Sequence, residues 1–595
     1  MNESVTQLPT WDLADLYPAP HSSALRADIA NIEAKVVEFQ KEFKGRVATL
    51  GDRLEEAIAA FEQIHEAMGK VASYAQLLRS EDLNDPQVAK FAQDIRERLN
   101  TISVDLLFFT LEINRIDEAL MTELLESGVA GRYRPWVENV RVYREHELSD
   151  DIERLLHEKS VTGAAAWNRL FDETLAAARF KIDGQEIAIE PALNRLSDPD
   201  RKRRSGAAEA LRLTFAEKAP LLALVSNVLA KDKEIEDRWR HYALPESARH
   251  LANLVEPEVV DALEHAVVSA YADTSHRYYR FKARWLGLEK LEHYDRNAPL
   301  PQADERKRTW GEARDIVLQA YGRFSSDLRA IGQRFFDNPW IDAALRPGKS
   351  PGAFAHPTVP SVHPYLLLNY QGKLRDVMTL AHELGHGVHQ ILAGPNGALM
   401  ADTPLTLAET ASVFGEQLVF RALLDAETDP HRRRHMLASK VEDMINTVIR
   451  QTAFYRFEKA VHTERREGEI PLDRIREIWL SVQRESLGPA FDLDADYQDY
   501  WCYIPHFIHS PFYVYAYAFG DCLVNALYAV YQEAESGFQE RYFAMLRAGG
   551  TKRHRELLAP FGLDASDPAF WSRGLGLIAT FVDELEEIGE GVMDA

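Results

Sequence analysis

The segment MTLAHELGHGVHQ, residues 378–390, combines a helical pattern with two histidines and a glutamate at a characteristic spacing. His382 and His386 are four residues apart, so on an α-helix both side chains project from one face, one turn apart. Two imidazoles at this spacing can bind a single metal ion, and Glu383 beside them can reach a water molecule on that ion. The H-E-x-x-H pattern therefore predicts two zinc ligands and a general base.

The apolar surroundings of this motif favour a buried metal site over a chance match. With 20 histidines in 595 residues, the pattern is expected by chance in roughly one such chain in ten. The helical frame in and around the segment is mostly apolar: Val377, Leu380, Ala381, Leu384, Val388, Ile391 and Leu392. The alternative is a polar helix face whose histidines only form hydrogen bonds.

A catalytic zinc ion needs a third protein ligand and one open position. His389 would stretch the coordination over two helical turns, so we expect it to pack or to support a ligand. The segment TPLTLAETASVFGEQLVF, residues 403–420, offers Glu409 and Glu416 on one face of an expected helix. One could bind the metal while the other holds a histidine N–H. Both lie in an apolar stretch, where an unpaired carboxylate is costly.

The remaining sequence predicts a mainly α-helical protein. Residues 23–130 read as successive amphipathic helices, residues 150–156 and 175–180 as further helices, and the chain after residue 373 is helical almost throughout. A helix can also start at residues 197–200. The best candidate for a domain boundary lies near residues 190–200.

Two segments depart from the helical pattern. KIDGQEIAI, residues 181–189, predicts a hairpin, because two short apolar segments flank the tight-turn pair Asp183-Gly184. Residues 345–372 are rich in proline and glycine and end in the apolar run from Tyr365 to Tyr370, which predicts a strand. This small β element directly precedes the metal-site helix, so we expect it to form a wall of the substrate cleft.

Composition excludes several classes of function. The 69 basic and 93 acidic residues give a formal charge of −24, which argues against a nucleic-acid partner. Two cysteines cannot build a disulfide framework. The N-terminus lacks a secretory pattern, and no apolar stretch approaches the roughly 20 residues of a membrane span. We therefore expect a cytoplasmic protein without a membrane partner, and a monomer, since nothing marks a coiled-coil seam.

The motif region resembles a known family. HELGH followed by ETASVFGE, residues 409–416, resembles the M3 (thimet oligopeptidase-like) metallopeptidases, and more closely their oligoendopeptidase F branch. Further similar segments follow in family order: WDLADLYP (11–18), TGAAAWNRLFDE (162–173), HRYYRFKARWLGLEKLEHYD (276–295), HPYLLLNYQGKLRDVMTLAHELGHGVHQ (363–390), IPHFIHSPFYVYAYAFG (504–520) and LRAGGTKRHRELLAPFGLD (546–564). The resemblance spans nearly the whole chain.

This resemblance implies a two-lobed helical clamshell with a deep substrate channel. It implies an N-terminal helical lobe over residues 1–195 and a catalytic metallopeptidase domain over residues 196–595. Family members cut short unstructured peptides at internal bonds, and the run from Tyr365 to Tyr370 resembles their edge strand, along which the substrate backbone lies. The residues implied to act are His382, His386 and Glu409 as ligands of one zinc ion per chain, and Glu383 as general base.

A cluster near the C-terminus also resembles a family feature. The segment WCYIPHFIHSPFYVYAY, residues 501–517, brings histidine and several tyrosines together. Such side chains can donate hydrogen bonds to the oxyanion that forms as the peptide bond is attacked. By resemblance, His506 and Tyr515 are the first candidates and Tyr513 the next, whereas we expect Tyr517 to lie in the core.

Three alternatives remain open at the level of sequence. The chain could be a zinc carboxypeptidase on a similar helical scaffold, with Arg375, Arg450 or Arg456 holding the free carboxylate of the substrate. It could also be a non-catalytic peptide-binding protein. The native metal could be manganese or cobalt, because ligand type alone does not distinguish them from zinc.

Overall fold

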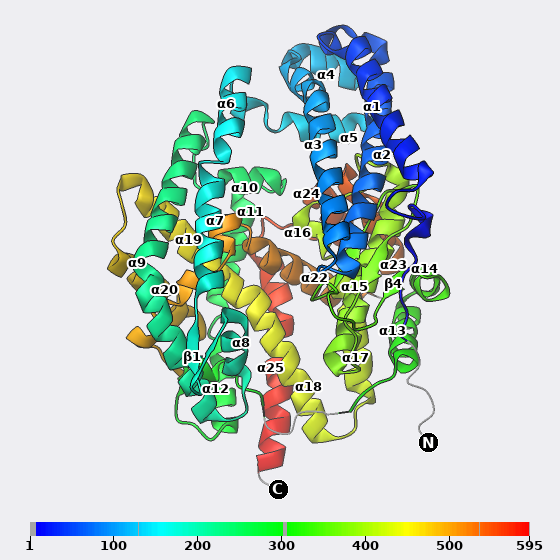
Figure 1. Ribbon diagram of the computed structural model, residues 1–595. Coiled ribbons are helices and arrows are strands. Elements are labelled where there is room, and N and C mark those ends of the chain that lie inside the picture. The colour runs from blue at the N-terminus through cyan, green and yellow to red at the C-terminus, as the bar shows by residue number, and fades with distance from the viewer. Residues whose placement is uncertain (1–7, 129, 301–305, 535, 594–595) are drawn as a thin grey trace. The chain divides into compact units, whose positions relative to one another are not determined.

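The computed structural model describes residues 8–128, 130–300, 306–534 and 536–593 (Figure 1). These residues are mainly helical, and their strands form three small sheets, which confirms the predicted fold class. The chain divides into two compact units, which are described separately. Unit 1 comprises Met1–Arg144, Glu305–Ala426 and Val530–Leu563; unit 2 comprises Glu145–Asp304, Glu427–Ala529 and Asp564–Ala595.

Each unit is assembled from three separate stretches of chain. The predicted division into an N-terminal helical lobe (residues 1–195) and a catalytic domain (residues 196–595) stays a prediction. The predicted substrate channel stays a prediction as well.

The N-terminal part of unit 1 is built on three long helices, α1 (Ser23–Phe43), α2 (Leu54–Glu81) and α3 (Pro86–Arg115). Ser22 caps α1, since its side chain accepts a hydrogen bond from the N–H of Leu25. Apolar faces meet where the rings of Phe39 and Phe61 each lie 5.1 Å from that of Phe109. Two shorter helices follow, α4 (Glu118–Glu126) and α5 (Arg134–Arg141).

The rest of unit 1 carries the predicted metal-site helix, α15 (Leu374–Ala393). Six further helices belong to this part: α13 (Trp310–Phe324), α14 (Ser326–Asp337), α16 (Leu405–Ala408), α17 (Ser412–Ala426), α23 (Phe538–Arg547) and α24 (His554–Leu558). Three strands precede α15 along the chain: β4 (Ile341–Asp342), β5 (Phe354–His356) and β6 (Tyr365–Leu367).

The strand order of this sheet corrects one expectation. The order is β4-β6-β5, with β4 parallel and β5 antiparallel to β6. The predicted strand at Tyr365 exists, but it is the central strand, and its role as an edge for the substrate is wrong. The N–H of Leu366 donates to the carbonyl of Trp340 at 2.9 Å, and the N–H of Leu368 to that of Asp342 at 2.8 Å. A strand as short as β4 shows no alternation in the sequence, so its presence was missed.

Unit 2 is built around the 39-residue helix α9 (Arg201–Trp239). Asp200 caps it with a hydrogen bond from the N–H of Lys202, which confirms the expected helix start. The other helices of the unit are α6 (Asp150–Ser160), α7 (Ala164–Ala177), α8 (Ile189–Asn194), α10 (Ser247–Ala252), α11 (Pro257–Ser269), α12 (Ser275–Trp285), α18 (Pro430–Met444), the π-helix Ile445–Ile449, α19 (Arg450–Glu467), α20 (Leu472–Leu487), α21 (His506–His509), α22 (Tyr515–Glu533) and α25 (Pro568–Met593).

The strands of unit 2 are short. The predicted hairpin is present as β1 (Phe180–Ile182) and β2 (Gln185–Ile187), and Asp183 and Gly184 at its turn both have positive φ. The helix expected over residues 175–180 is wrong beyond Ala177, because Phe180 already pairs in the hairpin. The remaining strands, β3 (Leu291–Glu292) and β7 (Phe491–Asp492), pair in parallel.

Among the described residues, α9 alone is long and apolar enough to pass a membrane-span test, with a mean hydropathy of 1.3 over its most apolar window. Long core helices pass the same test. One face of α9 is buried, including Leu211, Phe215 and Leu222. The expectation that no membrane is involved stays an expectation.

Candidate active site

Helix α15 presents the motif residues on a well-anchored frame. Asp376 in its first turn accepts hydrogen bonds from the backbone N–H groups of Gln371 and Lys373, at 2.8 and 2.9 Å. Several apolar residues of the helix, among them Leu380 and Leu384, are fully buried. His382, Glu383 and His386 therefore project from a helix whose opposite face is fixed in the core.

The segment that carries Glu409 is not the continuous helix expected from the sequence. Helix α16 ends at Ala408 and α17 begins at Ser412, so Glu409 lies in the turn between them. Tertiary contacts fix this turn, since Tyr542 donates its hydroxyl to the carbonyl of Thr410 at 2.8 Å. Glu409 and Glu416 thus reach the histidines from a turn and a helix, and not from one helix face.

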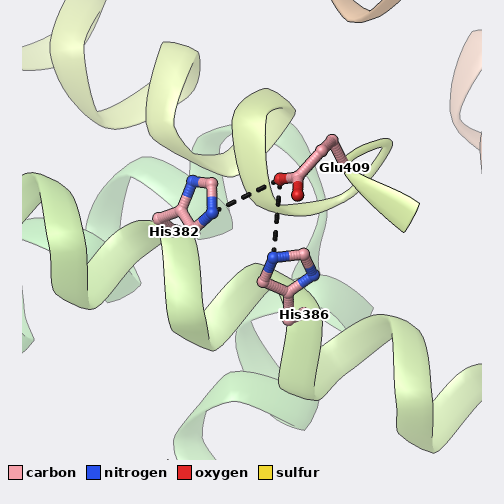
Figure 2. Close-up of side chains that lie close together, drawn as sticks. All are labelled: His382, His386 and Glu409. Carbon is pink, nitrogen blue, oxygen red and sulfur yellow. Dashed lines mark ion pairs between the residues drawn. The ribbon is translucent and has the colours of Figure 1, made fainter. Parts of the chain in front are cut away.

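His382, His386 and Glu409 form a compact group (Figure 2). A carboxylate oxygen of Glu409 (Oε2) lies 3.3 Å from Nε2 of His382 and 3.5 Å from Nε2 of His386. One ligand atom from each residue lies within 4.8 Å of the other two. Tetrahedral zinc with bonds of about 2.0–2.2 Å separates its ligand atoms by about 3.3–3.6 Å. These residues therefore fit a metal ion with two nitrogen ligands and one oxygen ligand.

Two further side chains hold the group in place. Oε2 of Glu416 lies 3.4 Å from Nδ1 of His382, on the side of the ring that faces away from Glu409. Ser412 donates its hydroxyl to Oε2 of Glu409 at 2.6 Å. Contacts of this kind orient metal ligands and fix their tautomers. The role of Ser412 was missed, because serine has no distinguishing spacing in the sequence.

His389 is not part of the metal group. It is buried, and its Nε2 atom lies 3.3 Å from the hydroxyl of Thr403. Burial lowers its pKa to about 4, so the ring is neutral. This position agrees with a packing role.

The acid–base properties of the site follow from burial and from neighbouring charges. Burial raises the pKa of Glu383 to about 7 against the opposing charge of His382. Burial lowers the pKa of His382, but its hydrogen bond with Glu416 and the nearby carboxylates outweigh burial and raise the value to about 9. Burial lowers the pKa of His386 to about 4. A metal ion would therefore compete with one proton on His382.

Strand β5 reaches the predicted base through its backbone. Ala355 lies opposite Leu366, whose own N–H bonds toward β4, so the backbone groups of Ala355 point away from β6. A hydrogen bond with the Ala355 backbone contributes to the pKa of Glu383. The carbonyl of Ala355 accepts from Nε2 of Gln390 at 3.5 Å. The open edge of β5 therefore faces α15 at Glu383.

The predicted oxyanion donors lie in unit 2, and the structure separates them into two sets. Tyr515 is 1% exposed, and its hydroxyl accepts a hydrogen bond from Asn253 at 2.8 Å and lies 3.1 Å from Nδ1 of His250. This hydroxyl is engaged inside the unit. Two buried side chains thus hold the hydroxyl of Tyr515, and the oxyanion role predicted for it stays a prediction.

His506 lies instead with Tyr513 and Tyr517. The ring of Tyr513 stacks on that of His506 at 6.0 Å, and the hydroxyl of Tyr517 lies 3.3 Å from Nε2 of His506. All three side chains are partly exposed. Tyr517 is thus not buried in the core, as was expected, and its hydroxyl lies next to the ring of His506.

A mainly helical protein with a His/His/Glu group and a buried carboxylate beside it has the site of a metallopeptidase. Comparison with known proteins gives the family. Residues 325–577 match the sequence model of Peptidase family M3, and residues 112–180 match that of Oligopeptidase F. The chain belongs to peptidase family M3, on its oligoendopeptidase F branch. This membership confirms the predicted class of enzyme, a metalloendopeptidase.

Curated relatives match over almost the whole chain. Oligopeptidase PepF from Bacillus subtilis is 26% identical over 592 residues, which cover 97% of this chain and 87% of the relative. An oligoendopeptidase F homologue from Borreliella burgdorferi is 25% identical and covers 97% of this chain and 98% of the relative.

Solved structures share the fold at lower identity. A putative peptidase from Chlamydophila abortus superposes with a TM-score of 0.83 at 20% identity, covering 96% of this chain and 98% of the other. Oligoendopeptidase-F from Enterococcus faecium superposes with a TM-score of 0.72 at 21% identity, covering 95% and 99%.

Proposed function

We propose that this protein is a zinc-dependent endopeptidase that hydrolyses internal bonds of short peptides. The observation that carries the proposal is the group of His382, His386 and Glu409, with the buried carboxyl group of Glu383 beside it on the same helix. The names of the relatives, oligopeptidase and oligoendopeptidase F, support the substrate class. A cytoplasmic location, a monomeric state and one zinc ion per chain remain predictions.

In this proposal the chain supplies three metal ligands and leaves one coordination position open. Zinc bound there would activate water and polarise the scissile carbonyl. Glu383 takes the proton of the attacking water on its carboxylate and later gives it to the leaving amine. Glu416 holds Nδ1 of His382, so that Nε2 stays directed at the metal.

The edge strand β5 is the proposed docking line for the peptide backbone. An extended peptide can add to an open strand edge through main-chain hydrogen bonds. Ala355 lies on this edge, and a docked peptide would replace the contacts that its backbone makes with Glu383 and Gln390. The proposed docking strand is thus β5 and not the predicted β6, because β6 is hydrogen-bonded to a strand on each side.

His506, Tyr513 and Tyr517 are the proposed donors to the oxyanion. An imidazole and a phenol can each donate to a developing negative charge, and removal of one such donor typically costs about 10²–10³-fold in kcat. The contact between Nε2 of His506 and the hydroxyl of Tyr517 supports a concerted role. Tyr515 is left out, because its hydroxyl is occupied by Asn253 and His250.

An internally quenched peptide of about ten residues, blocked at both ends, tests the proposal. We expect internal cleavage that 1,10-phenanthroline abolishes and added zinc restores. The Glu383→Gln variant should bind zinc and peptide but lack turnover. Cleavage that is indifferent to the chelator would exclude a metallopeptidase mechanism.

The same experiment separates the alternatives. A carboxypeptidase would cut only a peptide with a free C-terminus, and a peptide-binding protein would retain the blocked peptide without cutting it. Among the arginines considered for such a carboxylate site, Arg456 already pairs with Glu264 at 3.3 Å. Reconstitution with manganese or cobalt, compared at equal metal occupancy, identifies the ion that supports the highest rate.

A further inference from the structure

We propose that Glu458 is a positioning residue: it holds the backbone of Phe512 in a left-handed conformation and thereby fixes Tyr513 beside His506. All four residues belong to unit 2. The inference rests on the proposed function, because it gives Tyr513 a part in catalysis. Nothing in the sequence distinguishes Glu458 from the other acidic residues on the helical segments around it.

The contact that carries the proposal joins α19 to the segment before α22. Glu458 is 1% exposed, and its Oε1 atom accepts a hydrogen bond from the N–H of Phe512 at 2.9 Å. Phe512 has a φ of 58°, which side-chain-bearing residues rarely adopt. Such a conformation persists only where the surroundings enforce it, and it is concentrated at functional sites.

The ring of Phe512 is held as firmly as its backbone. It is fully buried, and its centroid lies 4.9 Å from that of His462 and 6.1 Å from that of Tyr455. Both neighbours lie on α19, one turn to either side of Glu458. Helix α19 therefore fixes Phe512 through a hydrogen bond to its backbone and through packing on its side chain.

The position of Tyr513 follows from the fixed position of Phe512, the residue before it. Its N–H donates to the carbonyl of Ser510 at 3.1 Å, and its ring stacks on that of His506 with an interplanar angle of 29°. A second helix, α10, contributes Arg249, whose Nε atom donates to the carbonyl of Pro511 at 3.2 Å and whose guanidinium lies 5.7 Å from the ring of Tyr513. Residues 510–513 are thus tied to two helices.

A cavity of about 440 Å³ lies behind these ties and is lined by Arg249, Glu458 and Pro511, among others. On the cavity side two hydrogen bonds hold the segment: Glu458 accepts one from the N–H of Phe512, and Arg249 donates one to the carbonyl of Pro511. The second carboxyl oxygen of Glu458 has no hydrogen-bond partner among the described residues. Burial of a carboxyl group that makes a single hydrogen bond costs stability. The burial of Glu458 therefore favours a positioning role.

Three variants of Glu458, each made alone and in a Tyr513→Phe background, test the proposal in the full-length, zinc-loaded protein. Glu458→Gln keeps an acceptor oxygen at the position of Oε1, Glu458→Met removes it at similar size, and Glu458→Asp withdraws it by one methylene. Tyr513→Phe is combined with each. We expect Glu458→Met to lower kcat at least tenfold with KM and zinc content unchanged, Glu458→Asp to lower it less, and Glu458→Gln to stay within about threefold.

The combination with Tyr513→Phe separates positioning from a general structural effect. If Glu458 acts through Tyr513, then Glu458→Met should cause little further loss in the Tyr513→Phe background. Full additivity of the two losses, or full activity of both Glu458→Met and Glu458→Asp, would overturn the proposal. Should Glu458→Met fail to fold, the Asp variant carries the same comparison.

Hydrogen exchange of the amides of residues 511–514 gives a readout that does not depend on peptidase activity. Loss of the acceptor should speed exchange there in Glu458→Met and leave Glu458→Gln close to the wild type. Unchanged exchange in the Met variant contradicts the positioning role even if the protein proves inactive on peptides. Faster exchange without any cleavage by the wild type would instead place the failure with the proposed function.

Discussion

Gly385 lies directly against Ala411: a β-carbon at residue 385 would lie 2.5 Å from the backbone carbonyl oxygen of Ala411 and 2.6 Å from the α-carbon of Ser412. Both contacts are with backbone, which cannot move aside as a flexible side chain can. The glycine inside the H-E-x-x-H motif thus allows the turn after Glu409 to approach α15. The approach places the carboxylate within reach of both histidines.

Substitution of this glycine should therefore damage the metal group. We expect Gly385→Ala to cost about 1–3 kcal/mol in free energy of unfolding, as overpacking does, and to weaken zinc binding by moving Glu409. Gly394→Ala is the matched control, because a β-carbon there meets nothing within 4 Å. Urea unfolding and zinc titration of both variants make the comparison. Equal zinc affinity in the two would contradict the role of the close approach.

Removal of the support behind His382 should weaken metal binding without abolishing it. Glu416→Gln loses the charge that holds Nδ1 of His382, and such changes typically cost about 10–100-fold in metal affinity. Asp425→Asn, at an exposed position of the same helix, should leave affinity unchanged. Competition with a chromophoric chelator measures both. A Gln variant with wild-type affinity would remove Glu416 from the site.

Activity should fall on the acidic side of neutrality. Glu383 acts as its carboxylate, and burial raises its pKa to about 7; a bound cation lowers this value, so the midpoint should lie at or below pH 7. Below the midpoint kcat/KM should fall about tenfold per pH unit. A pH profile at saturating zinc measures this limb. A rate that rises between pH 7 and pH 5 would contradict the assignment.

Stability should also depend on pH through Glu458. Burial raises its pKa from the ordinary value of 4.5 to about 8, so the folded state favours the protonated form. Its contribution to the free energy of unfolding should therefore decline by about 1.4 kcal/mol per pH unit between pH 4.5 and 8, and then level off. Glu458→Gln lacks this decline. Urea unfolding at pH 5.5, 7 and 8.5 should show a shallower loss of stability in the variant than in the wild type.

Two tyrosines two residues apart should respond differently to loss of the hydroxyl. Tyr517→Phe should lower kcat about 10²–10³-fold with little change in stability. Tyr515→Phe should leave kcat nearly unchanged but cost about 1–3 kcal/mol, because Asn253 loses its buried acceptor. Steady-state kinetics measures the change in kcat of both variants, and thermal unfolding measures their change in stability. The reverse outcome would restore Tyr515 as the donor.

Local patterns in the sequence predicted the helices, the hairpin at Asp183-Gly184 and the metal-site helix. Each of these depends on residues close together in the chain: a period of 3.6 residues, a turn pair, or two histidines four apart. Physical spacing also placed Glu409 and Glu416 as the candidates for the third ligand. It could not choose between them, and the choice of Glu409 came from the resemblance.

Errors arose wherever distant parts of the chain decide the local structure. The helix expected through Glu409 is interrupted by a turn, and the carbonyl of Thr410 in that turn accepts a hydrogen bond from Tyr542, more than 100 residues away. The strand at Tyr365 is central because the two-residue strand β4 pairs with it. The hydroxyl of Tyr515 is bonded to His250 on α10 and to Asn253 at the end of that helix, whereas the hydroxyl of Tyr517, expected in the core, lies beside His506.

The sequence by itself determined the class of fold through its helical periodicity, and it placed the two predicted histidine ligands beside the predicted base, because one helix turn carries all three. Tertiary structure alone decided how close Glu409 lies to the two histidines, which strand is central in the small sheet and which tyrosine hydroxyl is bonded inside its unit. Those outcomes depend on contacts between segments far apart in the chain, such as the hydrogen bond between Tyr542 and Thr410. No local pattern of residues encodes such a bond.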